Sequence, residues 1–121
     1  MKKIETKTNP KLLVAMDYEY VGKDVEIIIE TDEFNCLCPW SGQPDFAHIK
    51  ISYNPDQSCV ELKSLKLYLQ SYRNVGIVHE SVVNRVMNDL VKTIKPKSMS
   101  VEAIFNLRGG IKTTVKVEYK K

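Results

Sequence analysis

A cysteine and an aspartate lie at the two ends of a short turn that contains two prolines and a glycine. Cys38 precedes Pro39, Asp45 follows Pro44, and Gly42 lies between them. Proline fixes φ and glycine accepts backbone angles that other residues avoid, so this composition favours a turn held in one shape. The flanking segments are predicted strands, so a thiol and a carboxylate face each other across one connection. We interpret the pair as a nucleophile and a proton donor.

The alternative for this turn is a structural loop with a buried cysteine, because free cysteine is among the most buried residue types. The chain has three cysteines, an odd number that argues against a disulfide framework. Cys36, Cys38 and Cys59 also lack the paired spacing of a closed zinc site, and no metal is expected. We interpret Cys36 and Cys59 as structural residues.

The size and composition are typical of one ordinary globular domain. The chain has 121 residues, of which 43% are hydrophobic and 27% charged. The net charge of +3 is modest and neither requires nor excludes a nucleic acid. No apolar run approaches membrane-spanning length, and no signal-like apolar segment follows the basic pair at the start, so a cytoplasmic protein is expected.

Four segments alternate between apolar and polar residues and predict strands. Residues 24–33 run on toward Cys38 as the first strand, and residues 46–53 form the second, antiparallel to it. Residues 100–106 and 111–119 form the third and fourth strands, on either side of Arg108-Gly109-Gly110. Residues 1–23 show no clean period and are interpreted as a lead-in arm, which leaves a single domain over residues 24–121.

Two helices are predicted between these strand pairs. Ser58 and Glu61 have the spacing of a capping box, and an apolar stripe follows, which together predict a helix over about residues 59–73. Gly76 is predicted to stop it, and a second helix begins at His79 and ends before Pro96. The class is α+β, with a four-stranded antiparallel sheet and two helices in the order ββααββ. Such a sheet keeps two open edges, so a ring or barrel of subunits is expected.

Charged residues on the predicted helices have both an ordinary and a functional interpretation. A basic stripe of Lys63, Lys66 and Arg73, with the uncharged Gln70, lies beside the apolar one on the first helix. It is either a solvated face or a surface for an anionic cofactor. His79 and Glu80 open the second helix, where the helix dipole favours an acid, so they are either a capping arrangement or ligand-binding residues.

Four motifs resemble, in order and spacing, those of the nitrile reductases of queuosine biosynthesis, the 7-cyano-7-deazaguanine reductases. They are residues 33–47, 61–69, 79–80 and 105–111, and the resemblance extends from about residue 24 to the end. That family has the tunnelling fold, whose two strands, two helices and two strands match the order predicted above. Its members assemble into barrels with active sites between subunits, so the resemblance implies a homo-oligomer.

The resemblance implies the NADPH-dependent reduction of 7-cyano-7-deazaguanine, a small-molecule substrate, to 7-aminomethyl-7-deazaguanine, with no membrane or nucleic-acid partner. In this chemistry Cys38 adds to the nitrile carbon to give a covalent thioimide. Asp45 protonates the nitrile nitrogen, and His79 donates a proton or positions the reacting groups in the later steps. The resemblance places substrate binding at Glu80, Glu61 and Ser64, and cofactor binding at Lys63 and Lys66.

The residues of this chain bear on three other functions. An archaeosine-type amidinotransferase uses the same cysteine on a modified tRNA, but such relatives lack the signature segment to which Glu61, Ser64 and the two lysines belong. A zinc-dependent cyclohydrolase needs a set of Cys and His ligands with an open position. His48 and His79 are the two histidines of the chain, which is few for such a set. A non-catalytic barrel subunit or RNA-binding module would leave Cys38 and Asp45 unexplained.

Overall fold

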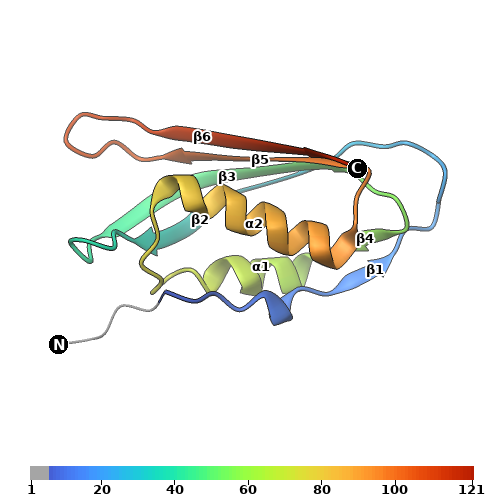
Figure 1. Cartoon of the computed structure of the whole chain (residues 1–121), viewed down its shortest axis with the longest axis horizontal. Helices are drawn as coiled ribbons and strands as arrows, with labels where there is room; N and C mark the ends of the chain where they lie inside the picture. The colour runs from blue at the N-terminus through green and yellow to red at the C-terminus, as the bar shows by residue number, and fades with distance from the viewer. Residues whose placement is uncertain (1–5) are drawn as a thin grey trace.

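A four-stranded antiparallel sheet covered on one face by two helices forms the body of the chain (Figure 1). The computed structural model describes residues 6–121. The sheet order is β2-β3-β5-β6, and no helix in this part of the chain could cross a membrane. The strands are β2 (Ile27–Leu37), β3 (Pro44–Asn54), β5 (Ser98–Phe105) and β6 (Thr114–Lys120), and the helices are α1 (Leu62–Gln70) and α2 (His79–Ile94). The predicted sheet, helices and ββααββ order are confirmed.

The core lies between the helices and the sheet face that they cover. Alternate residues of β3 and β5 point into it, as their alternating burial shows. From α2 it receives Val82, Val83, Val86, Met87, Leu90 and Ile94. Each fully buried aliphatic or aromatic side chain contributes about 1.5–3 kcal/mol relative to exposure, so this layer supplies the main stabilisation.

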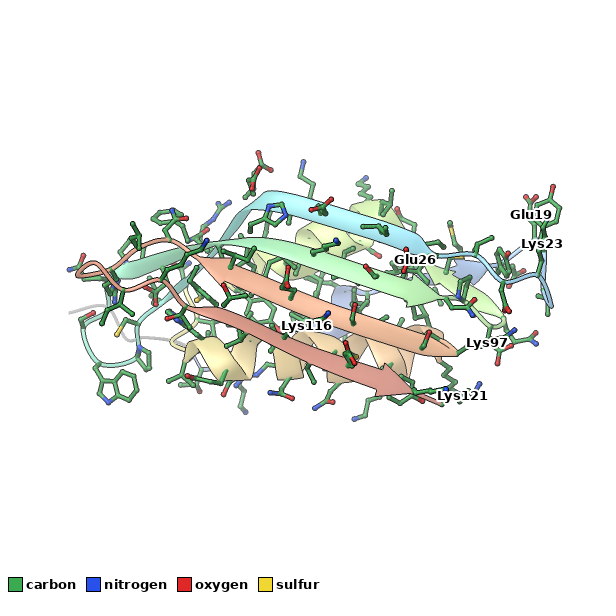
Figure 2. All side chains as sticks on the ribbon, turned by 90° about the horizontal axis from the view of Figure 1, so that it is seen from above. Glu19, Lys23, Glu26, Lys97, Lys116 and Lys121 are labelled. Atoms are coloured by element: carbon green, nitrogen blue, oxygen red, sulfur yellow. The ribbon has the colours of Figure 1, made fainter. Side chains whose placement is uncertain are left out.

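The other face of the sheet carries mostly polar side chains, and no helix of the described residues covers it (Figure 2). Opposite charges alternate across all four strands, in the order Glu30, Lys50, Glu102 and Lys116, because each residue is in register with the next. Cross-strand pairs of this kind contribute a few tenths of a kcal/mol up to about 1 kcal/mol each. Within residues 6–121, no other element covers this charged face or pairs with the outer edges of β2 and β6, except where Leu37 at the end of β2 bridges to Gly76.

The N-terminal arm contributes structure that its sequence does not predict. A short 3₁₀ helix, η1 (Pro10–Leu12), is followed by β1 (Ala15–Asp17), which pairs antiparallel with β4 (Ser58–Val60). Leu13, between η1 and β1, is buried in the core. The arm is therefore packed against the start of α1 instead of leading freely into the sheet.

The predicted start and end of the first helix are wrong. Ser58 belongs to β4, and the helix begins at Leu62 with Glu61 as its N-cap. The Glu61 carboxylate accepts hydrogen bonds from the backbone N–H groups of Lys63 and Ser64. The helix ends at Gln70, and Gly76 is not its left-handed stop, because it forms a parallel bridge with Leu37. The pairing of β1 with β4 decides this boundary, since it extends the backbone up to Val60.

The second helix ends where Pro96 predicts, with Lys95 in the left-handed conformation at φ 46°. The last two strands are displaced from their predicted bounds, because Ile111 pairs with Arg108 inside the connecting hairpin and β6 begins only at Thr114. Gly109 and Gly110 both have positive φ in this hairpin, which is the backbone conformation that glycine accepts without strain.

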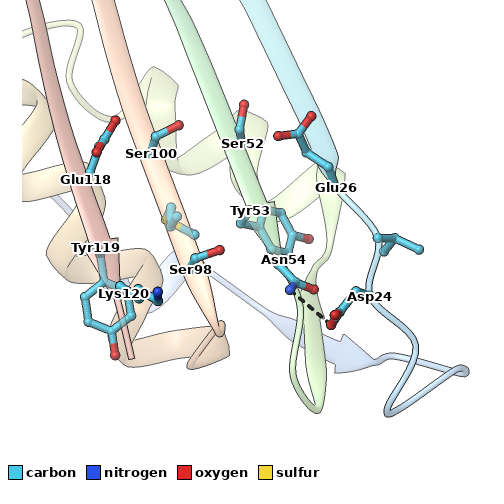
Figure 3. Close-up of a pocket in the computed structure, with 12 residues that line it drawn as sticks. Asp24, Glu26, Ser52, Tyr53, Asn54, Ser98, Ser100, Glu118, Tyr119 and Lys120 are labelled. Carbon is cyan, nitrogen blue, oxygen red and sulfur yellow. Dashed lines mark hydrogen bonds between the residues drawn. The ribbon is translucent and has the colours of Figure 1, made fainter.

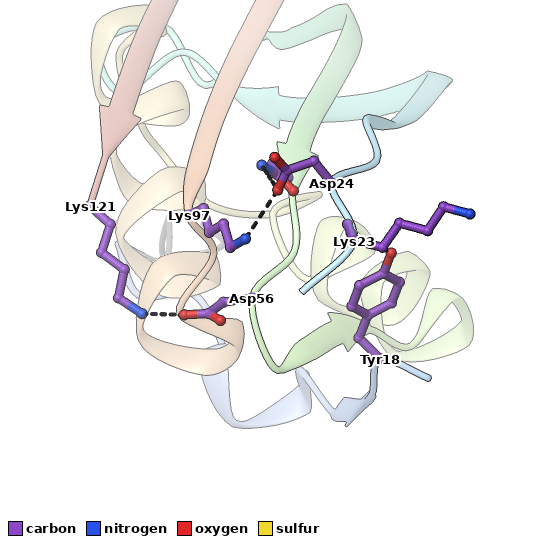
Figure 4. Close-up of polar contacts among 7 residues, drawn as sticks. Tyr18, Lys23, Asp24, Asp56, Lys97 and Lys121 are labelled. Carbon is purple, nitrogen blue, oxygen red and sulfur yellow. Dashed lines mark hydrogen bonds and ion pairs between the residues drawn. The ribbon is translucent and has the colours of Figure 1, made fainter. Parts of the chain in front are cut away.

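The sheet end farthest from the Cys38 turn carries a hollow of about 640 Å³ that both polar and apolar side chains line (Figure 3). Asn54 Nδ2 donates to Asp24 Oδ1 at 3.2 Å at its edge. Nearby, Lys97 pairs with Asp24 at 3.0 Å and Lys121 with Asp56 at 2.8 Å (Figure 4). These exposed pairs join the ends of β3, β5 and β6 to the segment before β2, and each contributes little to stability.

Candidate active site

The turn that carries Cys38 is closed by backbone hydrogen bonds. The Cys38 N–H donates to the Gln43 carbonyl and the Gly42 N–H donates to the Cys38 carbonyl, both at 2.8 Å. Gly42 has φ 72°, a left-handed conformation that other residues rarely adopt. The Gln43 N–H also donates to Ser41 Oγ at 3.2 Å. The thiol is thus presented from a fixed turn, as the prolines and the glycine predict.

A β-bulge sets the direction of the residues before this turn. The register between β2 and β3 shifts between Thr31 and Phe34, where β2 has one residue more than β3. An extra residue reverses the alternation of faces, so Phe34 and Cys36 are buried although the earlier half-buried positions of β2 are odd-numbered. Cys38, two residues beyond Cys36, therefore continues from the covered face of the sheet.

The Cys38 thiol is acidic for a cysteine. Its pKa is lowered to about 7, chiefly by a hydrogen bond from the Ser41 hydroxyl, then by the backbone N–H groups of Ser41 and Trp40, with a smaller effect of Arg108. Cys36 differs, because burial and the nearby Asp45 carboxylate raise its pKa to about 12. Since the thiolate is the reactive form, Cys38 is the more reactive thiol of this pair at neutral pH.

Asp45 is a buried carboxylate in contact with a histidine and an arginine. Its side chain is 9% exposed; Oδ2 lies 3.3 Å from His79 Nε2, and Oδ1 lies 2.9 Å from an Arg108 nitrogen. A buried charge is costly unless it is paired, so these contacts stabilise the carboxylate in the site. Asp45 lies opposite Cys36 in the register of β2 and β3, which brings it to the cysteine side of the turn.

The end of β2 also positions His79. The Leu37 N–H donates to the Val75 carbonyl at 2.9 Å, and the Ile77 N–H donates to the Leu37 carbonyl at 3.1 Å, so the segment that leads into α2 is fixed to β2. The imidazole stacks on the Phe105 ring with centroids 3.7 Å apart and an interplanar angle of 6°. Val78 is the N-cap of α2, and no side chain makes a capping hydrogen bond there. His79, the first residue of the helix, contacts Asp45 instead.

The other predicted site residues lie at different distances from this cluster. Glu80 is exposed in the first turn of α2, next to His79. Glu61 and Ser64 lie at the start of α1 beside β4, toward the opposite end of the molecule from the Cys38 turn (Figure 1). The Ser64 hydroxyl donates to the Glu61 carbonyl at 2.7 Å and accepts from the Val14 N–H at 3.0 Å. One chain therefore does not bring Glu61 or Ser64 to Cys38.

A groove of about 680 Å³ runs between α1 and the edge strand β2. Its walls include apolar side chains, and Lys66 and Arg73 of the basic stripe lie along it, whereas Lys63 is exposed outside the lining. Cations beside an apolar surface suit a phosphate-bearing dinucleotide, so these residues fit NADPH. In residues 6–121 no three His, Cys, Asp or Glu side chains form a cluster that could hold a metal ion.

Three residues of the cluster receive no role from the sequence: Ser41, Phe105 and Arg108. Ser41 lies three residues after Cys38 in a tight turn, a spacing from which its contact with the thiol could have been predicted. Phe105 and Arg108 approach from the β5–β6 hairpin, which is distant in sequence, so only the antiparallel pairing of β3 with β5 brings them to the turn.

The lowered pKa of Cys38 predicts selective alkylation near neutral pH. The rate of iodoacetamide labelling follows the thiolate fraction, so it should rise with pH to a half-maximum at about pH 7 instead of at the ordinary thiol value of 9.0. Peptide mass spectrometry of briefly labelled protein measures this profile for each cysteine. The denatured chain serves as the control, and a half-maximum near 9 in the folded chain would contradict the site described above.

The fold matches a solved structure of another protein. The crystal structure of the archaeosine synthase QueF-Like in the apo form aligns with a TM-score of 0.70 at 19% identity, over 82% of this chain and 95% of that one. At this identity the likeness shows the fold alone, which is the QueF-like fold.

Sequence comparison identifies the family. A family model described as QueF-like protein matches residues 44–121. The NADPH-dependent 7-cyano-7-deazaguanine reductase of Thermomicrobium roseum is 52% identical over 120 residues, 99% of this chain and 87% of the relative. The reductase of the same name from Caldicellulosiruptor bescii is 50% identical over 115 residues, 95% of this chain and 88% of the relative. The chain belongs to the QueF-like protein family, and the predicted resemblance is confirmed.

Proposed function

We propose that this chain reduces the nitrile of 7-cyano-7-deazaguanine to an aminomethyl group with NADPH, in queuosine biosynthesis, through a covalent thioimide at Cys38. The observation that carries the proposal is the acidic Cys38 thiol on a rigid turn beside the buried Asp45–His79 pair. Relatives of about 50% identity with the corresponding name support it. Nitrile-dependent loss of NADPH absorbance is the direct assay, and no loss with either compound omitted is the control.

The first step is addition of the thiol to the nitrile. The Cys38 sulfur forms a bond to the nitrile carbon, one π bond of the nitrile breaks, and its electron pair moves to nitrogen. The nitrogen gains one proton and the sulfur loses one, so the step needs no further reagent. Asp45 and His79, with 3.3 Å between Oδ2 and Nε2, are the groups that can hold this proton between the two atoms.

Reduction follows in two stages at the same carbon. NADPH, when bound, supplies the hydride for each stage. After the first, the nitrogen lone pair expels Cys38 as the thiolate and leaves an imine; after the second, the carbon carries an amine. A low pKa makes Cys38 a good leaving group as well as a nucleophile. His79 can donate a proton to nitrogen in this half of the reaction.

The base is bound, in this proposal, by residues of two subunits. Glu80, beside His79, accepts hydrogen bonds from the guanine-like N–H and amino groups. Glu61 and Ser64 belong to the pocket of a neighbouring copy, which accounts for their position away from Cys38 in one chain. The uncovered edges of β2 and β6 support assembly into a multi-subunit barrel, because open strand edges usually become paired.

Cofactor binding is assigned to the basic stripe of α1, which predicts a selective effect on NADPH. Lys66→Ala or Lys63→Ala should raise KM for NADPH by about tenfold, the effect of losing one charge-assisted hydrogen bond, and leave adduct formation without NADPH near the parent rate. Lys66 should have the larger effect, because it lines the groove.

Steady-state kinetics at varied NADPH, together with adduct formation followed by mass, separates the two steps. Lys92→Ala is the matched control, since Lys92 is an exposed lysine in the last turn of α2. If both lysine variants slowed adduct formation as much as they raised KM, the stripe would have another role, such as holding a subunit interface.

A further inference from the structure

Arg108 joins two hairpins at the site. It lies at the tip of the β5–β6 connection, where its backbone N–H and carbonyl both pair with Ile111 at 3.0 Å. From there one guanidinium nitrogen, Nη2, lies 2.9 Å from Asp45 Oδ1 and 3.3 Å from the Pro44 carbonyl. The hairpin is itself fixed to β3, because the Asn106 N–H donates to the Phe46 carbonyl at 2.9 Å. Arg108 thus contacts the two residues that end the Cys38 turn.

The Arg108 guanidinium lies beside the negative charge of this turn. Burial is the main cause of the raised pKa of Cys36, and the Asp45 carboxylate adds to it, so its charge opposes negative charge on a nearby sulfur. In the proposed addition step Asp45 exchanges a proton with Cys38, so the carboxylate and the thiolate come close together, which is an unfavourable arrangement of two anions. His79 contacts one carboxylate oxygen of Asp45, Oδ2, and the Arg108 guanidinium contacts the other, Oδ1. The positive charge of Arg108 therefore offsets the negative charge of the carboxylate.

We propose that Arg108 is a positioning residue for thiol addition: its guanidinium holds the Asp45 carboxylate at the start of β3 and offsets its charge beside the Cys38 sulfur. This inference rests on the proposed function, to which it adds a residue that the motifs leave without a role. An arginine suits this role because its planar group can contact a carboxylate and a carbonyl while remaining charged at any working pH.

Arg108→Met tests the proposal with two independent measurements. The half-maximum of Cys38 labelling by iodoacetamide should rise by about half a pH unit, which is roughly a threefold loss of thiolate below it. The rate of addition to 7-cyano-7-deazaguanine should fall about tenfold to a hundredfold, since the carboxylate is no longer held. Lys112→Met, which removes an exposed cation from the same hairpin, should match the parent in both measurements.

Arg108→Lys provides a second arm. It keeps the charge, so Cys38 labelling should keep its half-maximum near pH 7. The lysine ammonium lacks the planar guanidinium that contacts Asp45 and the Pro44 carbonyl, so addition to the nitrile should still be slower. Far-UV circular dichroism checks that both variants fold. A labelling profile or an addition rate that stays at the parent value in Arg108→Met overturns the proposal, as does full-rate addition in Arg108→Lys. If the parent chain does not add to the nitrile at all, the proposed function fails while labelling still tests Arg108.

Discussion

Cys38→Ala is expected to form no adduct with 7-cyano-7-deazaguanine and to show no NADPH oxidation above background. The physical reason is that the other two thiols cannot replace it. Cys36 is fully buried with its pKa raised to about 12, and Cys59 in β4 is also buried. Cys38 is the partly exposed cysteine of the three, and its pKa is about 7. The loss should therefore be complete, the largest effect of any single substitution in the site.

Intact mass spectrometry after mixing with the nitrile measures this directly. The parent chain should gain the mass of the base, and Cys38→Ala should gain none. Cys59→Ala is the matched control, because it removes a thiol outside the site and should keep the adduct. A mass gain that persists in Cys38→Ala would assign the nucleophile to another residue and remove the basis of the proposed mechanism.

Asp45→Asn is expected to bind the base but form the thioimide about a hundredfold to ten-thousandfold more slowly, the usual loss for one general acid. The amide has nearly the same shape and can still hydrogen-bond, but it cannot hold the proton that moves from sulfur to nitrogen. Stopped-flow measurement of adduct formation gives the rate. Addition at the parent rate would show that the proton comes from elsewhere, and His79, 3.3 Å away, would then be tested first.

Glu80→Ala provides the contrast for this result. Its proposed role is in binding, so the base should bind more weakly by about 1.5–3 kcal/mol while the saturated rate of addition changes little. Equal losses of rate in the two variants would mean that Asp45 and Glu80 act through the same step, contrary to the roles proposed for them.

Helices and strands whose bounds depend on residues nearby in the sequence were predictable. The alternation of β3 and β5 and the stop at Pro96 depend on nearby residues, and the structure follows them. The Cys38 turn is similar, because two prolines and a glycine constrain the backbone whatever surrounds it.

The start of α1 was not predictable in this way, because a distant strand decides it. Residues 58–60 have a good capping pattern for a helix, but pairing with residues 15–17 extends them as β4. Without a partner strand in view, the local signal at Ser58 favours the helix; with it, Glu61 becomes the cap. Tertiary pairing overrides local preference here.

The motifs predict candidate reactive residues but not what surrounds them. Cys38, Asp45 and His79 come from motifs, and the structure does bring Asp45 and His79 together. The Arg108 contact depends on the β5–β6 hairpin reaching the β2–β3 turn, a relation between residues 64 positions apart that no local pattern contains. Glu61 and Ser64 lie away from Cys38 in one chain, so their predicted role depends on a second copy.

Intact mass measured with and without NADPH tests whether this chain reduces the nitrile through a thioimide. The protein is mixed with 7-cyano-7-deazaguanine, NADPH is added to one half, and product and oxidised NADPH are quantified alongside the mass. The predicted result is an adduct that persists without NADPH and disappears with it, as two NADPH are oxidised for each aminomethyl product. An adduct that is unchanged by NADPH, or NADPH oxidation with no adduct in either half, would contradict the account.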